Sequence, residues 1–288
     1  MPAMKLETRL FIADFTHLDC AWFDPLQGLI GESWRVDAEL AGELADNGML
    51  CDFGVVKSVL KQALDEQIDH RLLLNAAQAA ELHNQSGHST ISLRNAASEE
   101  WHYRAPSSSF ALLDTPTIDA GHLAATLAAP LRALLPDNIT HLNLTLSPAH
   151  HQGPYRYCHG LRQHSGNCQR MAHGHRARLD IQVDGERHHQ LETDWQQRFD
   201  GRYIGSEEHL SISGSRHRYA YQASQGAFEL ELPQNRSCPI EAEPTVEHIT
   251  AHMARAIARQ LPGRRIECRA FEGIGKGAHS CAELKPRP

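Results

Sequence analysis

Histidine is concentrated in one stretch of this sequence. The chain has 288 residues and 20 His, and six of those His lie between His150 and His175. His173 and His175 open a segment in which apolar and polar residues alternate as far as Val183, a pattern that predicts a strand. Side chains two residues apart on a strand lie on the same face, so these two imidazoles are placed to bind one metal ion.

A third ligand must come from another segment. His159 ends a predicted strand, Tyr155–His159, and antiparallel neighbours bring such strand ends together. Three neutral imidazoles with one open coordination position are typical of catalytic zinc. An isolated His-x-His pair is weak support for a metal site, so a metal site and a structural His pair both stay open on these residues alone.

Cys168 lies five residues before His173, in the predicted loop between the two strands. A thiol beside a metal ion and several Arg has a lowered pKa and can act as a nucleophile or general base. An exposed loop cysteine without a role is the alternative. The chain has seven Cys without paired spacing, which favours reduced thiols over a disulfide framework.

The same stretch lacks acidic residues, although the chain as a whole is acidic. No Asp or Glu occurs from His141 to Leu179, so no carboxylate ligand can come from this segment, and it contains Arg156, Arg162, Arg170, Arg176 and Arg178. This pattern favours either a solvated basic face or a local field for an anionic, phosphorylated substrate.

The elements that carry these residues occur twice. Asp114–Leu146 and Glu243–Glu272 each contain a Pro-Thr helix start with an acid two residues after the Thr, an amphipathic helix, a Pro-containing break and a strand. Earlier in each half, Gly31–Leu40 corresponds to Gly174–Val183, and the strand Leu10–Phe15 corresponds to Tyr155–His159. We therefore interpret residues 1–150 and 151–288 as diverged copies of one domain.

Composition agrees with an ordinary folded protein of two units. The chain has 41% hydrophobic residues and a net charge of −7, which excludes a disordered chain and argues against a nucleic-acid partner. No apolar run is long enough for a membrane helix, and the N-terminus lacks a signal-peptide pattern, so we expect a cytoplasmic protein. Strands in runs with helices to one side predict an α+β fold.

Taken together, these motifs resemble the 6-pyruvoyl-tetrahydropterin synthase and 6-carboxytetrahydropterin synthase family. The second copy carries Tyr155-x-x-x-His159, Cys168, His173-Gly-His175, Pro244-Thr245-x-Glu247 and a last strand that ends in Glu272. The first copy carries Gly48-Met49-x-x-Asp52-Phe53-x-x-x-Lys57, which predicts a helix from Asp52, and Ile68-Asp69-His70. The resemblance covers nearly the whole chain as a tandem pair.

The resemblance implies a tandem tunnelling fold, in which each copy is a four-stranded antiparallel sheet with helices on one face. It also implies assembly into a barrel, as a homo-oligomer such as a trimer of tandem chains. By position, His159, His173 and His175 would hold Zn²⁺, Cys168 would transfer a proton, and Asp69 and His70 would form the acid-base pair. Glu272, with Thr245 and Glu247, would bind the pterin.

Each copy departs from the family pattern in a different way. In the first copy the zinc positions become Phe15, Ile30 and Glu32, and the pterin Glu becomes Leu146. In the second copy the Asp-His pair becomes Asp200-Gly201, after a helix that we expect to be about eleven residues shorter. This complementary loss predicts one composite site, completed by Asp69 and His70 of the first copy, either within a chain or between chains.

The function implied by the resemblance is that of a zinc-dependent lyase acting on dihydroneopterin triphosphate. We favour the 6-carboxytetrahydropterin synthase reaction, a step toward deazapurines such as queuosine. The alternatives are triphosphate elimination of the 6-pyruvoyl-tetrahydropterin synthase type, as in tetrahydrobiopterin synthesis, a related pterin cleavage or epimerisation, and a zinc- and pterin-binding barrel protein without turnover.

Overall fold

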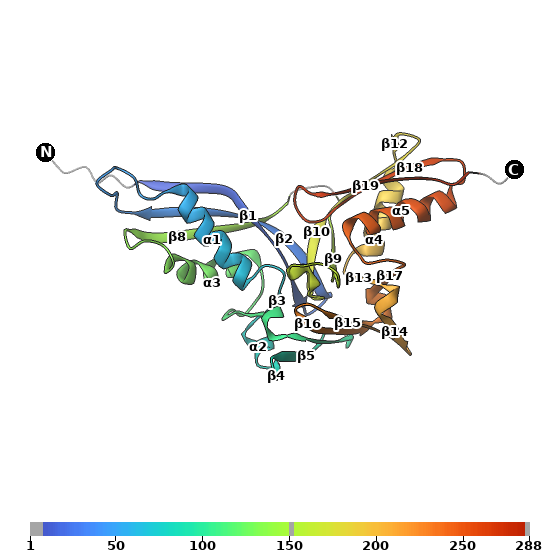
Figure 1. Cartoon of the computed structure of the whole chain (residues 1–288), viewed down its shortest axis with the longest axis horizontal. Coiled ribbons are helices and arrows are strands. Elements are labelled where there is room, and N and C mark those ends of the chain that lie inside the picture. The colour runs from blue at the N-terminus through green and yellow to red at the C-terminus, as the bar shows by residue number, and fades with distance from the viewer. Residues whose placement is uncertain (1–7, 150–152, 286–288) are drawn as a thin grey trace.

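The computed structural model describes residues 8–149 and 153–285, which form two α+β halves joined in the middle of an elongated molecule (Figure 1). The first half contains β1 (Arg9–Asp24), β2 (Gly28–Gly42), α1 (Phe53–Gln67), β3 (Leu72–Leu74), α2 (Ala76–Ala79), β4 (His83–Gln85), β5 (His88–Arg94), β6 (Glu100–Pro106), β7 (Phe110–Leu112), α3 (Ala120–Arg132) and β8 (Ile139–Pro148). The second half contains β9 (Tyr155–His159), β10 (His173–Ala177), β11 (Leu179–Val183), β12 (Glu186–Arg187), α4 (His189–Phe199), β13 (Arg202–Ser206), β14 (Leu210–Ser213), β15 (Arg216–Ala223), β16 (Gly226–Pro233), β17 (Ser237–Ile240), α5 (Val246–Gln260), β18 (Arg265–Phe271) and β19 (Gly277–Glu283).

The two halves share one topology, and the predicted tandem α+β fold is confirmed. The strand order is β7-β3-β1-β2-β8 in the first half. In the second half it is β17-β13-β9-β10 and, after a break at Arg178, β12-β11-β18-β19. The predicted boundary between residues 150 and 151 falls outside the described residues. Each of the four sheets that the described residues form is open, and β8 and β19 are edge strands.

Local sequence explains where the helices begin. Asp52 accepts hydrogen bonds from the amides of Gly54 and Val55, so α1 starts where predicted. Thr245 caps α5 in the same way. In the first half, however, Asp119 rather than Thr117 is the cap of α3, so the predicted Pro-Thr start lies two residues too early there.

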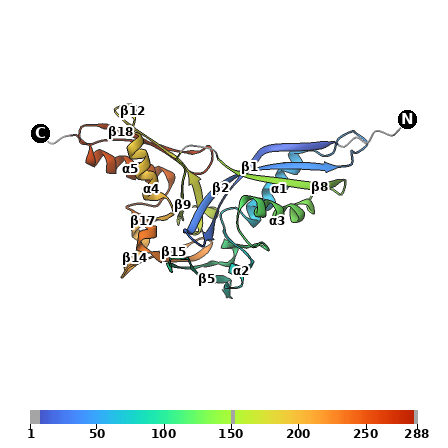
Figure 2. The same cartoon turned by 180° about the vertical axis from the view of Figure 1, so that it is seen from behind.

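Three apolar clusters lie within the part of the chain that the structure describes. The first lies between the β1-β2-β8 sheet and helices α1 and α3, and the second between the β11-β18 sheet and helices α4 and α5 (Figure 2). The third is under a six-stranded sheet, β14-β15-β16-β6-β5-β4, to which each half contributes three strands. None of the helices among the described residues is long and apolar enough to span a bilayer.

An approximate two-fold axis relates the halves. Strands β6 and β16 pair antiparallel at the centre of the six-stranded sheet, with Tyr103 opposite its own counterpart Leu230. Gly31 and Gly174 are also counterparts, and a Cβ built on either glycine would lie 2.7 Å from the Cα of the other. Because equivalent residues meet each other, the contact between the halves has the isologous geometry of a two-fold dimer.

Candidate metal centre and acid-base site

The structure brings the three predicted imidazoles to one point. Strands β9 and β10 pair antiparallel with His173 opposite His159, and His175 follows on the same face. One ring nitrogen of each lies within 4.8 Å of the others, and all three residues are buried. The strand pairing that the sequence predicted is therefore what assembles this cluster.

The Nδ1 atom of each ring lies near an oxygen acceptor. His159 Nδ1 lies 2.8 Å from the Pro244 carbonyl oxygen and His173 Nδ1 lies 2.5 Å from that of Arg170. His175 Nδ1 lies 3.0 Å from Oδ1 of Asp19, a residue of the first half. Protons on Nδ1 leave the Nε2 atoms as lone-pair donors.

The three Nε2 atoms fit a metal ion. Those of His159 and His175 are 3.0 Å apart, and His173 Nε2 is a buried atom without a hydrogen-bond partner. When the Nδ1 atoms of His159 and His175 carry the protons, the lone pairs of their two Nε2 atoms face each other and repel unless a cation lies between them. Burial, together with neighbouring His175, lowers the pKa of His159 to about 4, so its imidazole is the neutral form that ligates metals.

Asp19 is a site residue that the sequence analysis missed. It is buried at the inner part of β1 and also accepts a hydrogen bond from the Ser33 hydroxyl. Burial alone would raise the pKa of Asp19, but His175, Lys276 and Ser33 outweigh it and hold the pKa below its ordinary value. The available signal was an acid inside the apolar segment Leu18–Phe23.

An Asp-His-Cys group lies beside the imidazole cluster. His70 Nδ1 is 2.5 Å from Asp69 Oδ2, and ligand atoms of His70, Cys168 and His173 lie within 4.8 Å of one another. Burial would lower the pKa of His70, but hydrogen bonds with Asp69 and Cys168 outweigh it and raise the pKa to about 10. Asp69 and His70 belong to the first half and Cys168 to the second, so the predicted composite arrangement occurs within a single chain.

Glu272 follows β18 and reaches the same cluster. Its Oε1 lies 3.9 Å from Nε2 of both His159 and His175, and Lys276 Nζ lies 3.7 Å from its Oε2. Burial would raise the pKa of Glu272, but His175, His159 and Lys276 lower it below its ordinary value. The carboxylate is therefore a charged acceptor at the edge of the site.

Two other predicted residues lie at the start of α5, which follows the Pro244 carbonyl that His159 contacts. The Thr245 hydroxyl accepts a hydrogen bond from the His248 amide. In the structure Thr245 therefore caps the start of α5. Glu247 is exposed in the first turn of that helix. Their assignment to substrate stays a prediction.

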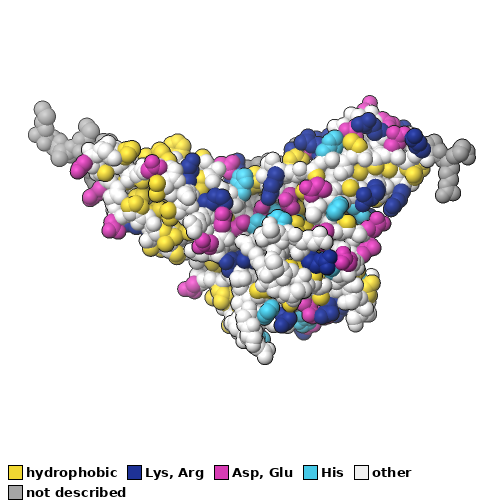
Figure 3. Space-filling model, in the orientation of Figure 1, with side chains coloured by type: hydrophobic (Ala, Val, Ile, Leu, Met, Phe, Trp, Pro, Cys, Tyr) yellow, Lys and Arg dark blue, Asp and Glu magenta, His cyan; other side chains and the backbone are white. Residues whose placement is uncertain are grey.

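A cavity of about 400 Å³ opens beside the acid-base pair. Asp19, Asp69, His70 and Lys276 line it together with side chains of β1 and α1. Figure 3 shows His, basic and acidic side chains near the middle of the molecule, beside a lobe on the left that carries more apolar surface. The site thus has room for a small molecule next to groups that can transfer protons.

The second half has Asp200 and Gly201 where the first half has Asp69 and His70, so it lacks the acid-base pair there. In the second half the Arg156 amide donates to Asp200, and the Gly201 amide donates to the Arg156 carbonyl. The Asp19 amide donates to Asp69, and the His70 amide to the Asp19 carbonyl, in the same way. His70 and Gly201 also share a positive φ, of 55° and 65°. The alignment of Asp69-His70 with Asp200-Gly201 is thereby supported.

Three details of the comparison between copies were wrong. Trp22 pairs with Ile30 as His159 pairs with His173, so Trp22, not Phe15, is the counterpart of His159. The same register gives Pro148, not Leu146, as the counterpart of Glu272. Helix α4 has 11 residues and α1 has 15, because most of the deletion falls in the connection before the helix.

Comparisons with known proteins identify the family of this chain. The family model described as 6-pyruvoyl tetrahydropterin synthase matches twice, at residues 17–152 and 149–278. A structure of 6-pyruvoyltetrahydropterin synthase from Plasmodium vivax is 17% identical, with a TM-score of 0.40, and the match covers 50% of this chain and 92% of that one. For the Plasmodium falciparum enzyme the values are 18%, 0.39, 49% and 91%. A comparison with curated proteins gives no significant match. The two family matches, which together span most of the sequence, show that this chain belongs to the 6-pyruvoyl tetrahydropterin synthase family and carries its domain twice.

Proposed function

We propose that this chain is a zinc-dependent lyase that converts dihydroneopterin triphosphate, with one composite site per chain. The observation that carries the proposal is the convergence of one ring nitrogen from each of three buried His residues beside the Asp69-His70-Cys168 group. Membership of the family supports a pterin substrate. Of the two family reactions we favour the one that yields 6-carboxytetrahydropterin, with loss of acetaldehyde and triphosphate.

Bound zinc would polarise side-chain oxygens of the substrate and so acidify the adjacent C–H and O–H bonds. His159, His173 and His175 would hold the ion through Nε2. Glu272, a charged acceptor at the edge of the site, would receive hydrogen bonds from the pterin amide and amino groups.

The proton is moved by residues of both halves. The Cys168 sulfur accepts a proton from the substrate as a thiolate and returns it at another position. His70 exchanges that proton with Cys168, since its Nδ1 is engaged by Asp69 and its Nε2 is free for the sulfur. The Asp69 carboxylate holds the ring in this orientation and stabilises the imidazolium.

The open edges of β8 and β19 support assembly of several chains, because unpaired strand edges are rarely left exposed. We therefore propose a homo-oligomer, with a trimer of tandem chains as the expected form. Light scattering coupled to size-exclusion chromatography measures its mass, and a monomer at working concentration would contradict this part of the proposal.

The decisive experiment incubates the zinc-loaded chain with dihydroneopterin triphosphate and identifies products by mass. The two family reactions give products of different mass, and zinc binding without turnover would instead indicate a zinc- and pterin-binding protein. His70→Ala should abolish turnover and retain zinc, whereas His173→Ala should lose both. His102→Ala is the control, because His102 lies on the face of the six-stranded sheet that is turned away from the third apolar cluster, where it contacts Ser92. Full activity of His70→Ala would refute the composite site.

A further inference from the structure

The second half has a sheet face that the proposed site does not use. In the sheet that contains β11, β18 and β19, strand β18 turns Ile266, Cys268 and Ala270 toward the core under α5. The intervening residues of β18 and β19 lie on the opposite face, because side chains alternate along a strand. On that face Cys281 is directly opposite Glu267, and His279 is opposite Arg269.

Three potential metal ligands meet on this face. His279 Nε2 lies 3.4 Å from Glu267 Oε2 and 3.7 Å from Cys281 Sγ, and one ligand atom of each lies within 4.8 Å of the others. Arg265 donates to Glu267 Oε1 at 2.9 Å, which orients the carboxylate and leaves Oε2 toward the imidazole. The contacts are therefore made by atoms that can all bind one cation.

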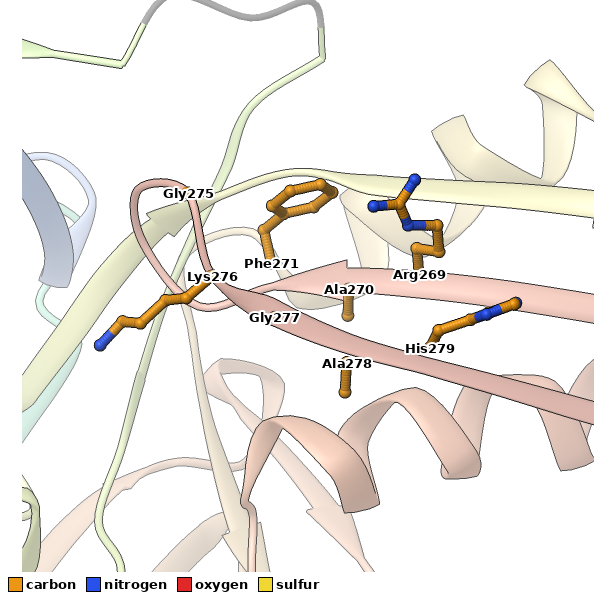
Figure 4. A pocket seen from close by; sticks show the side chains of 8 residues that line it. All are labelled: Arg269, Ala270, Phe271, Gly275, Lys276, Gly277, Ala278 and His279. Atoms are coloured by element: carbon orange, nitrogen blue, oxygen red, sulfur yellow. The ribbon is translucent and has the colours of Figure 1, made fainter.

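The cluster adjoins open space. A hollow of about 390 Å³ is lined by Glu267 and His279 together with Asp180, Gln182 and Arg269. Figure 4 shows His279 projecting from β19 beside Arg269 on β18. Water can thus reach the cluster and complete a coordination sphere.

We propose that Glu267, His279 and Cys281 form a second metal site, which takes a divalent cation of the zinc type with water as the remaining ligand. Thiolate, imidazole and carboxylate are the three ligand classes that zinc uses in proteins. On binding, Cys281 forms its sulfur–metal bond and releases its thiol proton to solvent. Adjacent antiparallel strands already hold the three side chains together, so binding requires little ordering of the chain.

The test is protection of the thiol by zinc. The full chain, with its thiols reduced, is treated with a maleimide in the presence and absence of zinc chloride, and each cysteine is followed by peptide mass spectrometry. We expect zinc to slow modification of Cys281 by about tenfold or more, since a coordinated thiolate is not free to attack. Cys51, a partly exposed cysteine of the first half, should be unaffected.

Variants separate this site from the imidazole cluster. His279→Ala and Glu267→Gln should each abolish protection of Cys281, whereas His173→Ala should preserve it. Equal modification rates with and without zinc would overturn the proposal. So would protection that persists in His279→Ala, because the thiol would then bind zinc without the other ligands.

Discussion

The contact between Asp19 and His175 predicts that the first half controls metal binding by the second. The carboxylate lies 3.0 Å from Nδ1 of His175 and also accepts from Ser33. Asp19→Asn keeps an oxygen acceptor of similar size but removes the negative charge that makes His175 a more basic ligand. We expect zinc to bind more weakly, with the fold retained.

The expected magnitude follows from the class of interaction. Removal of a carboxylate behind a metal-bound His costs about 10–100-fold in metal affinity, or about 1.4–2.7 kcal/mol. Asp19→Ala should cost stability as well, because it leaves the buried donors of His175 and Ser33 unpaired, at about 1–3 kcal/mol each. Asp19→Asn is therefore the cleaner variant.

Competition against a zinc chelator measures the affinity, and thermal unfolding of the metal-free chain checks the fold. Asp14→Asn is the matched control, since Asp14 is an exposed residue of the same strand that pairs with His17 at 2.8 Å. Unchanged zinc affinity in Asp19→Asn, or an equal loss in Asp14→Asn, would refute the reasoning.

Three further predictions concern the interface, the second half and the substrate. Gly31→Ala forces a Cβ into the backbone of the other half and should cost about 1–3 kcal/mol of unfolding free energy in urea, whereas Gly121→Ala in α3 should stabilise by up to about 1 kcal/mol. Burial would raise the pKa of Glu192, but Arg187 and other partners outweigh burial and lower the pKa. The charged carboxylate therefore stabilises the folded chain at pH values above its unfolded pKa, and this stabilisation is lost as the pH falls through its folded pKa. Glu192→Gln should therefore unfold at lower temperature than the wild type at pH 7, and the difference should vanish in acid. Glu272→Gln should weaken pterin binding by about 1.5–3 kcal/mol in calorimetry, with zinc content unchanged.

The sequence was informative where chemistry depends on neighbouring strands. The spacing of His173 and His175, with His159 on the preceding strand, required only one antiparallel pairing to predict the cluster, and β9 and β10 make that pairing. The helix start at Asp52 was equally local. These features depend on residues close in the chain, for which periodicity and capping rules suffice.

Other features depend on contacts between distant segments. Asp19 and His175 are brought together only by packing of β1 against β10 across the halves, and no spacing rule encodes that contact. The wrong pairing of Phe15 with His159 has a similar cause, since β1 is 16 residues long and its counterpart β9 has five. Sequence alone did not indicate which part of the longer strand corresponds to the shorter one.

The position in one half that corresponds to the proposed site of the other half has different residues. In a two-fold dimer of identical subunits, every interface site occurs twice, and a substitution changes both. A fused chain is free of this constraint. Here Glu32 stands at the counterpart of His175, its carboxylate 3.9 Å from Arg176, and Arg156 stands at the counterpart of Asp19.

These substitutions reverse the charge around the second position, which is the position that corresponds to the imidazole cluster. At the imidazole cluster, Asp19 and Glu272 place negative charge beside the rings, which favours a cation. At the second position two guanidinium groups already compensate Glu32, so a metal ion there would meet positive charge and no imidazole. Burial raises the pKa of Glu32 despite these neighbours, because removing the charged carboxylate from water costs free energy. The second position thus places Glu32 beside Arg176 of the other half, where the proposed site has imidazoles, and a tandem chain allows its two positions to differ in this way.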